Sequence, residues 1–171
     1  IYPSVHFVSP LEQMKKLRKI IERDIDESNI KLIPGGIRDI EFTVQALQLL
    51  NGGKDETIKT GNTLNALKKL NQTKLLTKTE TKTLWDAYIL YRRIEHFLQL
   101  MNNTQTHTIP ESGEIAEKLS FYLGFRDLSE FKEKIKRYRE QVRAIYNSVV
   151  GESKKVSGKK KFFTQIKFAN P

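Results

Sequence analysis

The sequence of 171 residues contains no cysteine, which excludes disulfide bonds and metal sites built on thiolates. No apolar run approaches the roughly 18 residues that a membrane-spanning helix needs. Stretches of alternating apolar and polar residues, which are typical of strands, are missing as well. The sequence also lacks a phosphate-binding loop, a dinucleotide-binding glycine pattern, a nucleophile elbow and a His-Glu-x-x-His zinc motif. These absences favour a helical protein that carries no complete catalytic motif of a familiar kind.

The first residues, Ile1 to His6, have neither the basic nor the apolar region of a signal peptide. Together with the lack of cysteine, this favours a cytoplasmic protein without a membrane segment. A first residue other than Met indicates a fragment or a processed chain.

The formal net charge of +10 is unevenly distributed. Residues 152–171 hold six lysines and one glutamate, so this short segment carries half of the excess. The remaining charge is ordinary for a soluble domain. We therefore expect a flexible basic tail at 152–171, and the charge pattern argues against a nucleic-acid-binding core.

Apolar residues recur at helical spacing through most of the chain, and Gly, Pro and Asn residues separate the periodic segments. This pattern predicts six helices, at about 11–27, 36–51, 62–70, 77–102, 113–123 and 128–150. The predicted fold class is all-α, a helical bundle with a short extended segment or brief strand at 30–33. We divide the chain into an N-terminal extension at 1–10, a helical bundle at 11–151 and the tail.

In the first predicted helix, apolar residues at positions 14, 17, 20 or 21, and 25 recur at three to five residues. We expect Leu17 and either Ile20 or Ile21 to lie on the apolar face of this helix and Arg18 to lie on the other face.

The stretch Lys31-Leu32-Ile33-Pro34-Gly35-Gly36-Ile37-Arg38-Asp39-Ile40-Glu41-Phe42-Thr43-Val44-Gln45 brings a glycine pair to the start of a helix. One interpretation is a tight turn that begins a core helix. The other is an anion site, because a helix N-terminus presents backbone N–H groups and a positive dipole end. The candidates for nucleotide or phosphate binding, or for a domain interface, are Gly35, Gly36, Arg38, Asp39, Glu41 and Gln45.

A second polar cluster lies at the end of the longest predicted helix and in the loop that follows. Its members are Arg92, Arg93, Glu95, His96, Gln99, Gln105 and His107. Glu95 falls on the apolar stripe, where a carboxylate is costly unless a cation pairs with it, so we expect Arg92 or a cation from another helix beside it. His96 and His107 lack further ligands at suitable spacing, so we expect no metal site.

These motifs occur in an order that resembles one family. The glycine stretch is followed by Leu49-x-Asn51-Gly52-Gly53, Asn62-Thr63-Leu64-x-Ala66-Leu67, Ala87-Tyr88, Arg92-Arg93-x-Glu95-His96-x-Leu98-Gln99 and Gln105-Thr106-His107-x-Ile109-Pro110. This pattern, from about 11 to 150, resembles the helical domain that follows the nucleotidyltransferase palm in glutamine-synthetase adenylyltransferase. It is most similar to the N-terminal, adenylyl-removing half, and PII uridylyltransferases share a version of the first motif.

The resemblance implies a parent enzyme that transfers or removes adenylyl groups on glutamine synthetase with ATP and Mg²⁺. Its partners would be the palm domain, glutamine synthetase and a PII-type regulator. We expect the palm to be absent from this chain, which alone would then be inactive and would hold no cofactor. Ile33 stands where the family usually has Gly, which weakens the expectation that a phosphate approaches the backbone closely there. A stand-alone interaction module and a basic nucleic-acid binder remain alternatives.

Overall fold

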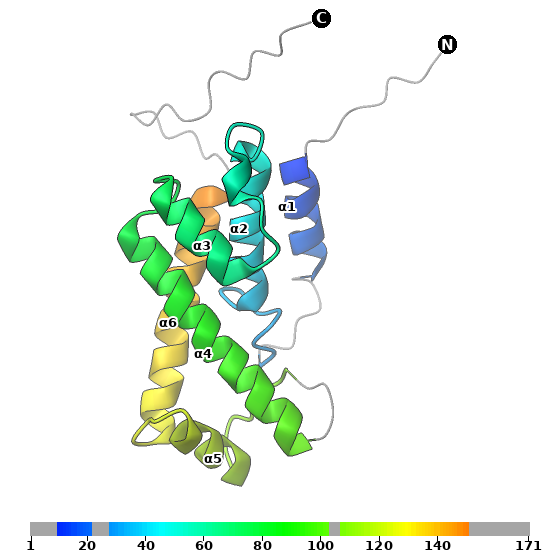
Figure 1. Cartoon of the computed structure of the whole chain (residues 1–171). Helices are drawn as coiled ribbons and strands as arrows, with labels where there is room; N and C mark the ends of the chain where they lie inside the picture. Colours follow the sequence, from blue (N-terminus) through cyan, green and yellow to red (C-terminus); the bar gives the residue numbers. More distant parts are fainter. Residues whose placement is uncertain (1–9, 22–27, 103–106, 151–171) are drawn as a thin grey trace, which may run out of the picture.

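The computed structural model describes residues 10–21, 28–102 and 107–150, and within these ranges it is a bundle of α-helices without strands (Figure 1). The elements are α1 Pro10–Ile21, α2 Ile37–Asn51, the 3₁₀ turn η2 Glu56–Ile58, α3 Thr63–Gln72, α4 Lys78–Asn102, α5 Glu114–Tyr122 and α6 Leu128–Val149. The predicted all-α bundle of six helices is confirmed. Across the described ranges, no helix has an apolar stretch long enough to span a bilayer.

The three longest helices form the centre of the bundle. α2 packs against α6 and α4, and α4 also packs against α6. α3 covers α2 and α4, α1 lies along α2, and α5 contacts α6 at the lower end of the molecule in Figure 1. This arrangement places the loop before α2 between helices that are distant in sequence.

Local side-chain bonds explain where several helices begin. Thr77 and Glu80 form a reciprocal capping box before α4, with each backbone N–H donating to the other's side chain at 2.8 and 3.1 Å. Asn62 caps α3 and Asp127 caps α6 through their side-chain oxygens. Gly124, with φ +87°, ends α5 in the left-handed conformation that favours glycine.

The core is formed by the apolar stripes that the sequence predicts. Buried residues on the central helices are Ile37, Ile40, Val44, Leu47, Leu84, Tyr91, Ile94, Leu98, Phe131, Ile135 and Val142. Each fully buried aliphatic or aromatic side chain contributes about 1.5–3 kcal/mol from the hydrophobic effect alone. Packing of these stripes therefore fixes α2, α4 and α6 relative to one another.

The predicted orientation of the first helix is wrong. Arg18 is buried, with 2% of its side chain exposed, whereas Leu17 and Ile20 are exposed by 49% and 61%. Arg18 lies inward because its guanidinium pairs with a buried carboxylate and donates to two carbonyl oxygens, as described below. Charge pairing, rather than apolar periodicity, orients α1.

The segment before the glycine pair contains turns and one isolated bridge, between Asn29 and Thr108, rather than a strand. Asn29 causes the turn, since its backbone oxygen accepts from the N–H groups of Leu32 and Ile33 and its side chain accepts from Lys31 and Leu32. Several predictions lie outside the described residues: the extension, the end of the first helix at 22–27, Gln105 and the basic tail.

The Pro34–Gly36 turn lies directly against α6. A Cβ atom added at Gly35, whose φ is +78°, would lie 2.0 Å from the backbone oxygen of Arg139. A Cβ atom at Gly36 would lie 2.3 Å from the backbone oxygen of Ile30. Both glycines are therefore required by close approach of backbone to backbone.

We predict that Gly35→Ala destabilises the chain far more than Gly124→Ala. Both positions have positive φ, but nothing lies within 4 Å of a Cβ atom at Gly124. Gly124→Ala should cost about 1 kcal/mol from backbone strain alone, whereas Gly35→Ala should cost at least about 3 kcal/mol because the turn must leave α6. Urea denaturation measures both, and equal losses would show that the close contact does not exist.

Candidate functional site

Asp39, in the first turn of α2, is fully buried, and its carboxylate accepts two hydrogen bonds and forms an ion pair with a further arginine. Its Oδ1 lies 2.6 Å from Nε of Arg18, and its Oδ2 accepts from Nη1 of Arg143 at 3.0 Å and from the backbone N–H of Gly35 at 2.7 Å. A lone carboxylate in this position would be strongly disfavoured, so the two arginines are what allow it to be buried. The Asp39 cluster (Arg18, Asp39, Arg143 and Gly35) joins α1, α2, α6 and the glycine turn.

Arg18 also holds the segment that leads into the turn. Its Nη1 donates to the backbone oxygen of Leu32 at 2.7 Å and its Nη2 to that of Ile33 at 3.2 Å. Arg139 on α6 donates from Nε to the oxygen of Pro34 at 3.4 Å. Arginines from two other helices thus fix the segment that leads into the glycine pair.

Every backbone N–H from Gly35 to Asp39 donates to an acceptor within the chain. Gly35 donates to the Asp39 carboxylate, and Gly36, Ile37 and Arg38 donate to the oxygens of Ile33, Ile30 and Lys31 at 2.9–3.1 Å. Asp39 donates to the oxygen of Gly36 at 3.2 Å. The carboxylate therefore occupies the place that an external anion would take at this helix N-terminus, and a phosphate bound nearby would depend on side chains.

Arg38 lies on the outer side of the same turn. Its Nη1 donates to Oε2 of Glu41 at 3.2 Å, its guanidinium lies 5.9 Å from the centre of the Phe42 ring, and 40% of the side chain is exposed. Its buried Nε has no hydrogen-bond partner among the described residues. Gln45, one turn further along, is exposed. The exposed part of the Arg38 guanidinium is therefore open to a ligand, in a position set by the anchored turn.

Glu95 on α4 is the second buried carboxylate, and basic side chains from three segments surround it. Oε2 lies 2.5 Å from Nη1 of Arg92, and Oε1 lies 2.9 Å from Nδ1 of His107 and 3.8 Å from Nζ of Lys31. The expected pairing of Glu95 with Arg92 is confirmed. We call Lys31, Arg92, Glu95 and His107 the Glu95 cluster.

The pKa of His107 is lowered, first by its partial burial and then by the positive charge of Lys31, while the Glu95 carboxylate opposes the shift. The imidazole is thus neutral at pH 7 and lies between a carboxylate and a lysine. Its role in the Glu95 cluster is to link the loop after α4 to that helix.

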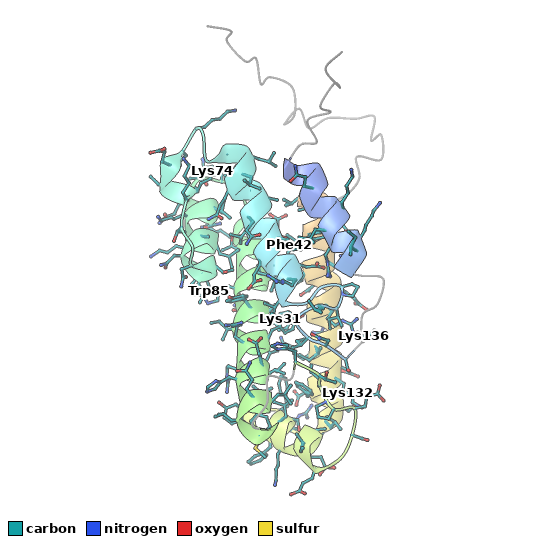
Figure 2. All side chains as sticks on the ribbon, turned by 90° about the vertical axis from the view of Figure 1, so that its right-hand side faces the viewer. Lys31, Phe42, Lys74, Trp85, Lys132 and Lys136 are labelled. Atoms are coloured by element: carbon teal, nitrogen blue, oxygen red, sulfur yellow. The ribbon has the colours of Figure 1, made fainter. Side chains whose placement is uncertain are left out.

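Lys31 connects the two clusters that the sequence predicts separately. Its side chain approaches Glu95, and its backbone oxygen accepts from the N–H of Arg38 (Lys31 and Phe42 are labelled in Figure 2). Other members of the second predicted cluster lie elsewhere. Arg93 contacts Tyr122 on α5, with its guanidinium 5.5 Å from the ring centre, and His96 is exposed.

Sequence reasoning missed Arg18, Arg143 and Lys31 as parts of these clusters. Arg143 lies on α6, 104 residues from Asp39, so no local pattern reveals the pair. Arg18 was missed because the apolar residues beside it predict a buried face that does not include it. The sequence indicated only that Asp39 and Glu95, if buried, would need cations beside them. It did not indicate which residues supply those cations.

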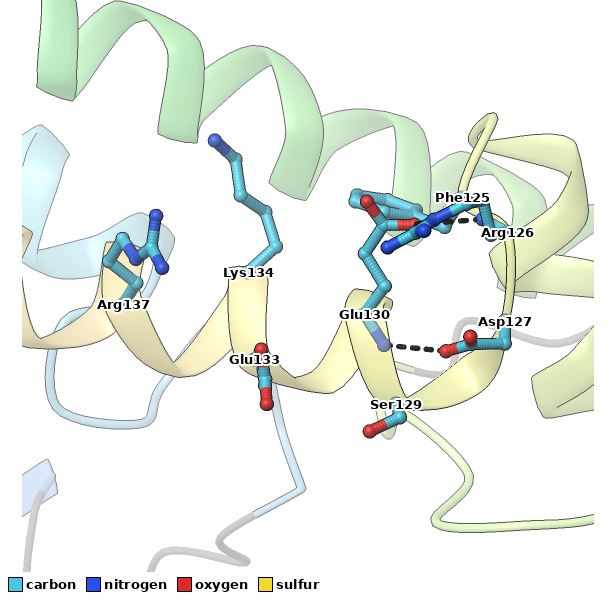
Figure 3. A pocket seen from close by; sticks show the side chains of 8 residues that line it. All are labelled: Phe125, Arg126, Asp127, Ser129, Glu130, Glu133, Lys134 and Arg137. Atoms are coloured by element: carbon cyan, nitrogen blue, oxygen red, sulfur yellow. Dashed lines mark hydrogen bonds and ion pairs between the residues drawn. The ribbon is translucent and has the colours of Figure 1, made fainter.

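A hollow of about 530 Å³ at the start of α6 is separate from both clusters (Figure 3). The charges at the helix end are used in capping: Asp127 accepts from the N–H of Glu130 at 2.8 Å, and the Glu130 carboxylate accepts from the Arg126 backbone at 2.9 Å. None of the residues predicted as functional lines this hollow.

Neither cluster suits a metal ion, and the side chain of this region that suits a phosphate is Arg38, which lies outside both. Both buried carboxylates are already balanced by cations, so neither fits an Mg²⁺ ligand. In the described part of the chain, no group of three or more acidic, His or Cys side chains could hold a metal ion. Arg38, by contrast, has the fork geometry that suits phosphate oxygens.

A family model described as GlnD PII-uridylyltransferase matches residues 10–150, which is most of the chain. The chain belongs to this family. The match extends from α1 to the end of α6 and so includes both the Asp39 cluster and the Glu95 cluster.

Curated relatives carry the name bifunctional glutamine synthetase adenylyltransferase/adenylyl-removing enzyme. The protein from Mannheimia haemolytica is 33% identical over 85% of this chain and 17% of its own length. Those from Neisseria meningitidis serogroup A and Chromobacterium violaceum are 34% and 37% identical over 84% and 73% of this chain. The chain spans about a sixth of the length of these relatives, so it corresponds to a helical domain of an adenylyltransferase-like protein.

We predict that Asp39→Asn lowers the free energy of unfolding by about 3–5 kcal/mol, because it leaves two arginines facing a neutral amide in a buried site. Asp86→Asn is the matched control, since Asp86 pairs with Lys82 at the surface and its loss should change stability little. Chemical denaturation measures both variants. Similar small effects would show that the Asp39 cluster does not hold the helices together.

Proposed function

We propose that this helical domain forms one wall of the nucleotide and substrate cleft in a glutamine-synthetase adenylyltransferase-like nucleotidyltransferase. The observation that carries the proposal is Arg38, a partly exposed cation beside a turn that other arginines hold rigidly. Rigid support is what an active-site cation needs, because a preorganised charge loses little free energy in reorganising around the reacting group.

The Asp39 cluster supports this role indirectly. It keeps Gly35 against α6 and so sets the position from which the Arg38 side chain extends. Arg38 would contact a phosphate of the nucleotide, while Glu41 orients its guanidinium from the next turn. Glu41 and Gln45 would lie at the boundary with the palm domain.

The rest of the reaction would come from outside this chain. The relatives are named for adding adenylyl groups to glutamine synthetase and removing them. By this proposal the parent protein acts on glutamine synthetase in the cytoplasm, uses ATP and Mg²⁺ held by a palm domain, and responds to a PII-type regulator. Catalysis by this chain alone is not part of the proposal, since both of its buried carboxylates serve as structural counter-ions.

In the full-length parent protein, Arg38→Ala should lower kcat/KM for adenylyl transfer or removal at least about tenfold, because a charge-assisted phosphate contact is lost. Arg126→Ala is the matched control. Arg126 is also a surface arginine, and it pairs with Glu130 in the first turn of α6. Both should leave the melting temperature nearly unchanged. If Arg38→Ala retains full activity, the proposed place of Arg38 in the cleft is wrong.

A further inference from the structure

A groove of about 360 Å³ lies between α6 and two connecting segments of the chain. Its floor is apolar: Ile109 and Pro110 are partly exposed there, whereas Ile33, Phe131 and Ile135 are buried core residues. We call it the α6 groove. It is separate from the capped hollow of Figure 3, although both lie along α6. An apolar floor of this size suits a large aliphatic or aromatic side chain or a small apolar ligand body.

Cations line one edge of the α6 groove. Lys132, Lys136 and Arg139 follow one another at i, i+4 and i+7 on α6, and Figure 2 shows the two lysines one above the other along this helix. Within the described ranges, neither lysine forms an ion pair, and Nε of Arg139 donates only to the oxygen of Pro34. Glu111 is the acidic residue among those lining the groove. Like charges on one helix face repel each other. An anionic partner would relieve this repulsion, so the charges on this edge favour binding of an anionic partner.

The spacing of the cations fits a helical partner. Seven residues of helix rise about 10 Å, so the three charges extend in a row of that length. Carboxylates at i, i+4 and i+7 of a second helix have the same spacing and lie beside an apolar stripe on that helix. A helix lying in an apolar groove is a common mode of peptide recognition.

We propose that the α6 groove binds an acidic amphipathic helix from a protein partner. Apolar side chains of that helix pack on Ile109 and Pro110, and its carboxylates pair with Lys132, Lys136 and Arg139. The inference does not rest on the proposed role of Arg38, which lies on α2 and does not line the groove.

The test uses the whole chain and a fluorescein-labelled helical peptide of about 18 residues. The peptide carries leucines at i and i+4 beside glutamates at i+1, i+5 and i+8, and a peptide of the same composition in scrambled order is the first control. Fluorescence anisotropy gives the Kd. The double variant K132E/K136E should weaken binding at least about tenfold, since two attractive charge pairs become repulsive.

The matched control is K54E/K68E, which reverses two exposed lysines far from the groove in sequence and lowers the net charge equally. It should weaken binding less than about threefold, as expected for long-range attraction alone. Circular dichroism checks that both variants fold, and amide chemical shifts should change mainly in 28–33, 109–111 and 131–139.

Three results would overturn the proposal: equal weakening by the two double variants, equal binding of the scrambled peptide, or chemical-shift changes that avoid the groove. ATP is tested on the same proteins. Binding of ATP that K132E/K136E abolishes, without binding of the peptide, would identify a nucleotide site instead of a helix-binding groove.

Discussion

The neutralisation of the buried Asp39 carboxylate is the interaction on which the rest of this structure depends. Arg18 and Arg143 come from helices at opposite ends of the described sequence and meet at this one side chain. Because the carboxylate also accepts from the Gly35 N–H, the same contact closes the turn before α2. Such a charge cannot be left unpaired in the core, so α1, α2 and α6 must assemble together around it.

A second buried carboxylate, on α4, is neutralised in the same way. Glu95 gathers Lys31, Arg92 and His107, and Lys31 belongs to the segment that Arg18 holds on its other side. The turn is therefore fixed from two directions. Arg38 extends from this fixed segment toward solvent, and this geometry makes it the best candidate for contact with a phosphate. The adenylyltransferase relatives give that candidate a chemical setting.

Much of the fold could be predicted from the sequence, because apolar period and capping residues are local signals. The stripe from Ile37 to Leu47 follows the apolar period, and α6, which Asp127 caps, begins where a helix is predicted. The orientation of α1 could not be predicted, since Leu17 and Ile20 follow the right period but Arg18 finds a buried acid. The candidate site was predicted in part: Asp39 and Glu95 stand out locally, whereas Arg143 is brought to Asp39 only by the packing of α6 on α2. The glycine pair is explained by backbone contacts with Arg139 and Ile30 rather than by open amides.

Native-state hydrogen exchange of the backbone amides of Gly35 to Asp39 tests the central claim most directly. If these amides are bonded within the chain and held by the Asp39 cluster, they should exchange only through openings whose free energy approaches that of global unfolding. Amides at surface turns such as Gly53 should exchange much faster. Rapid exchange at Gly35, Ile37 and Arg38 would contradict the account, because it would mean that the turn opens independently of the bundle and presents its amides to solvent.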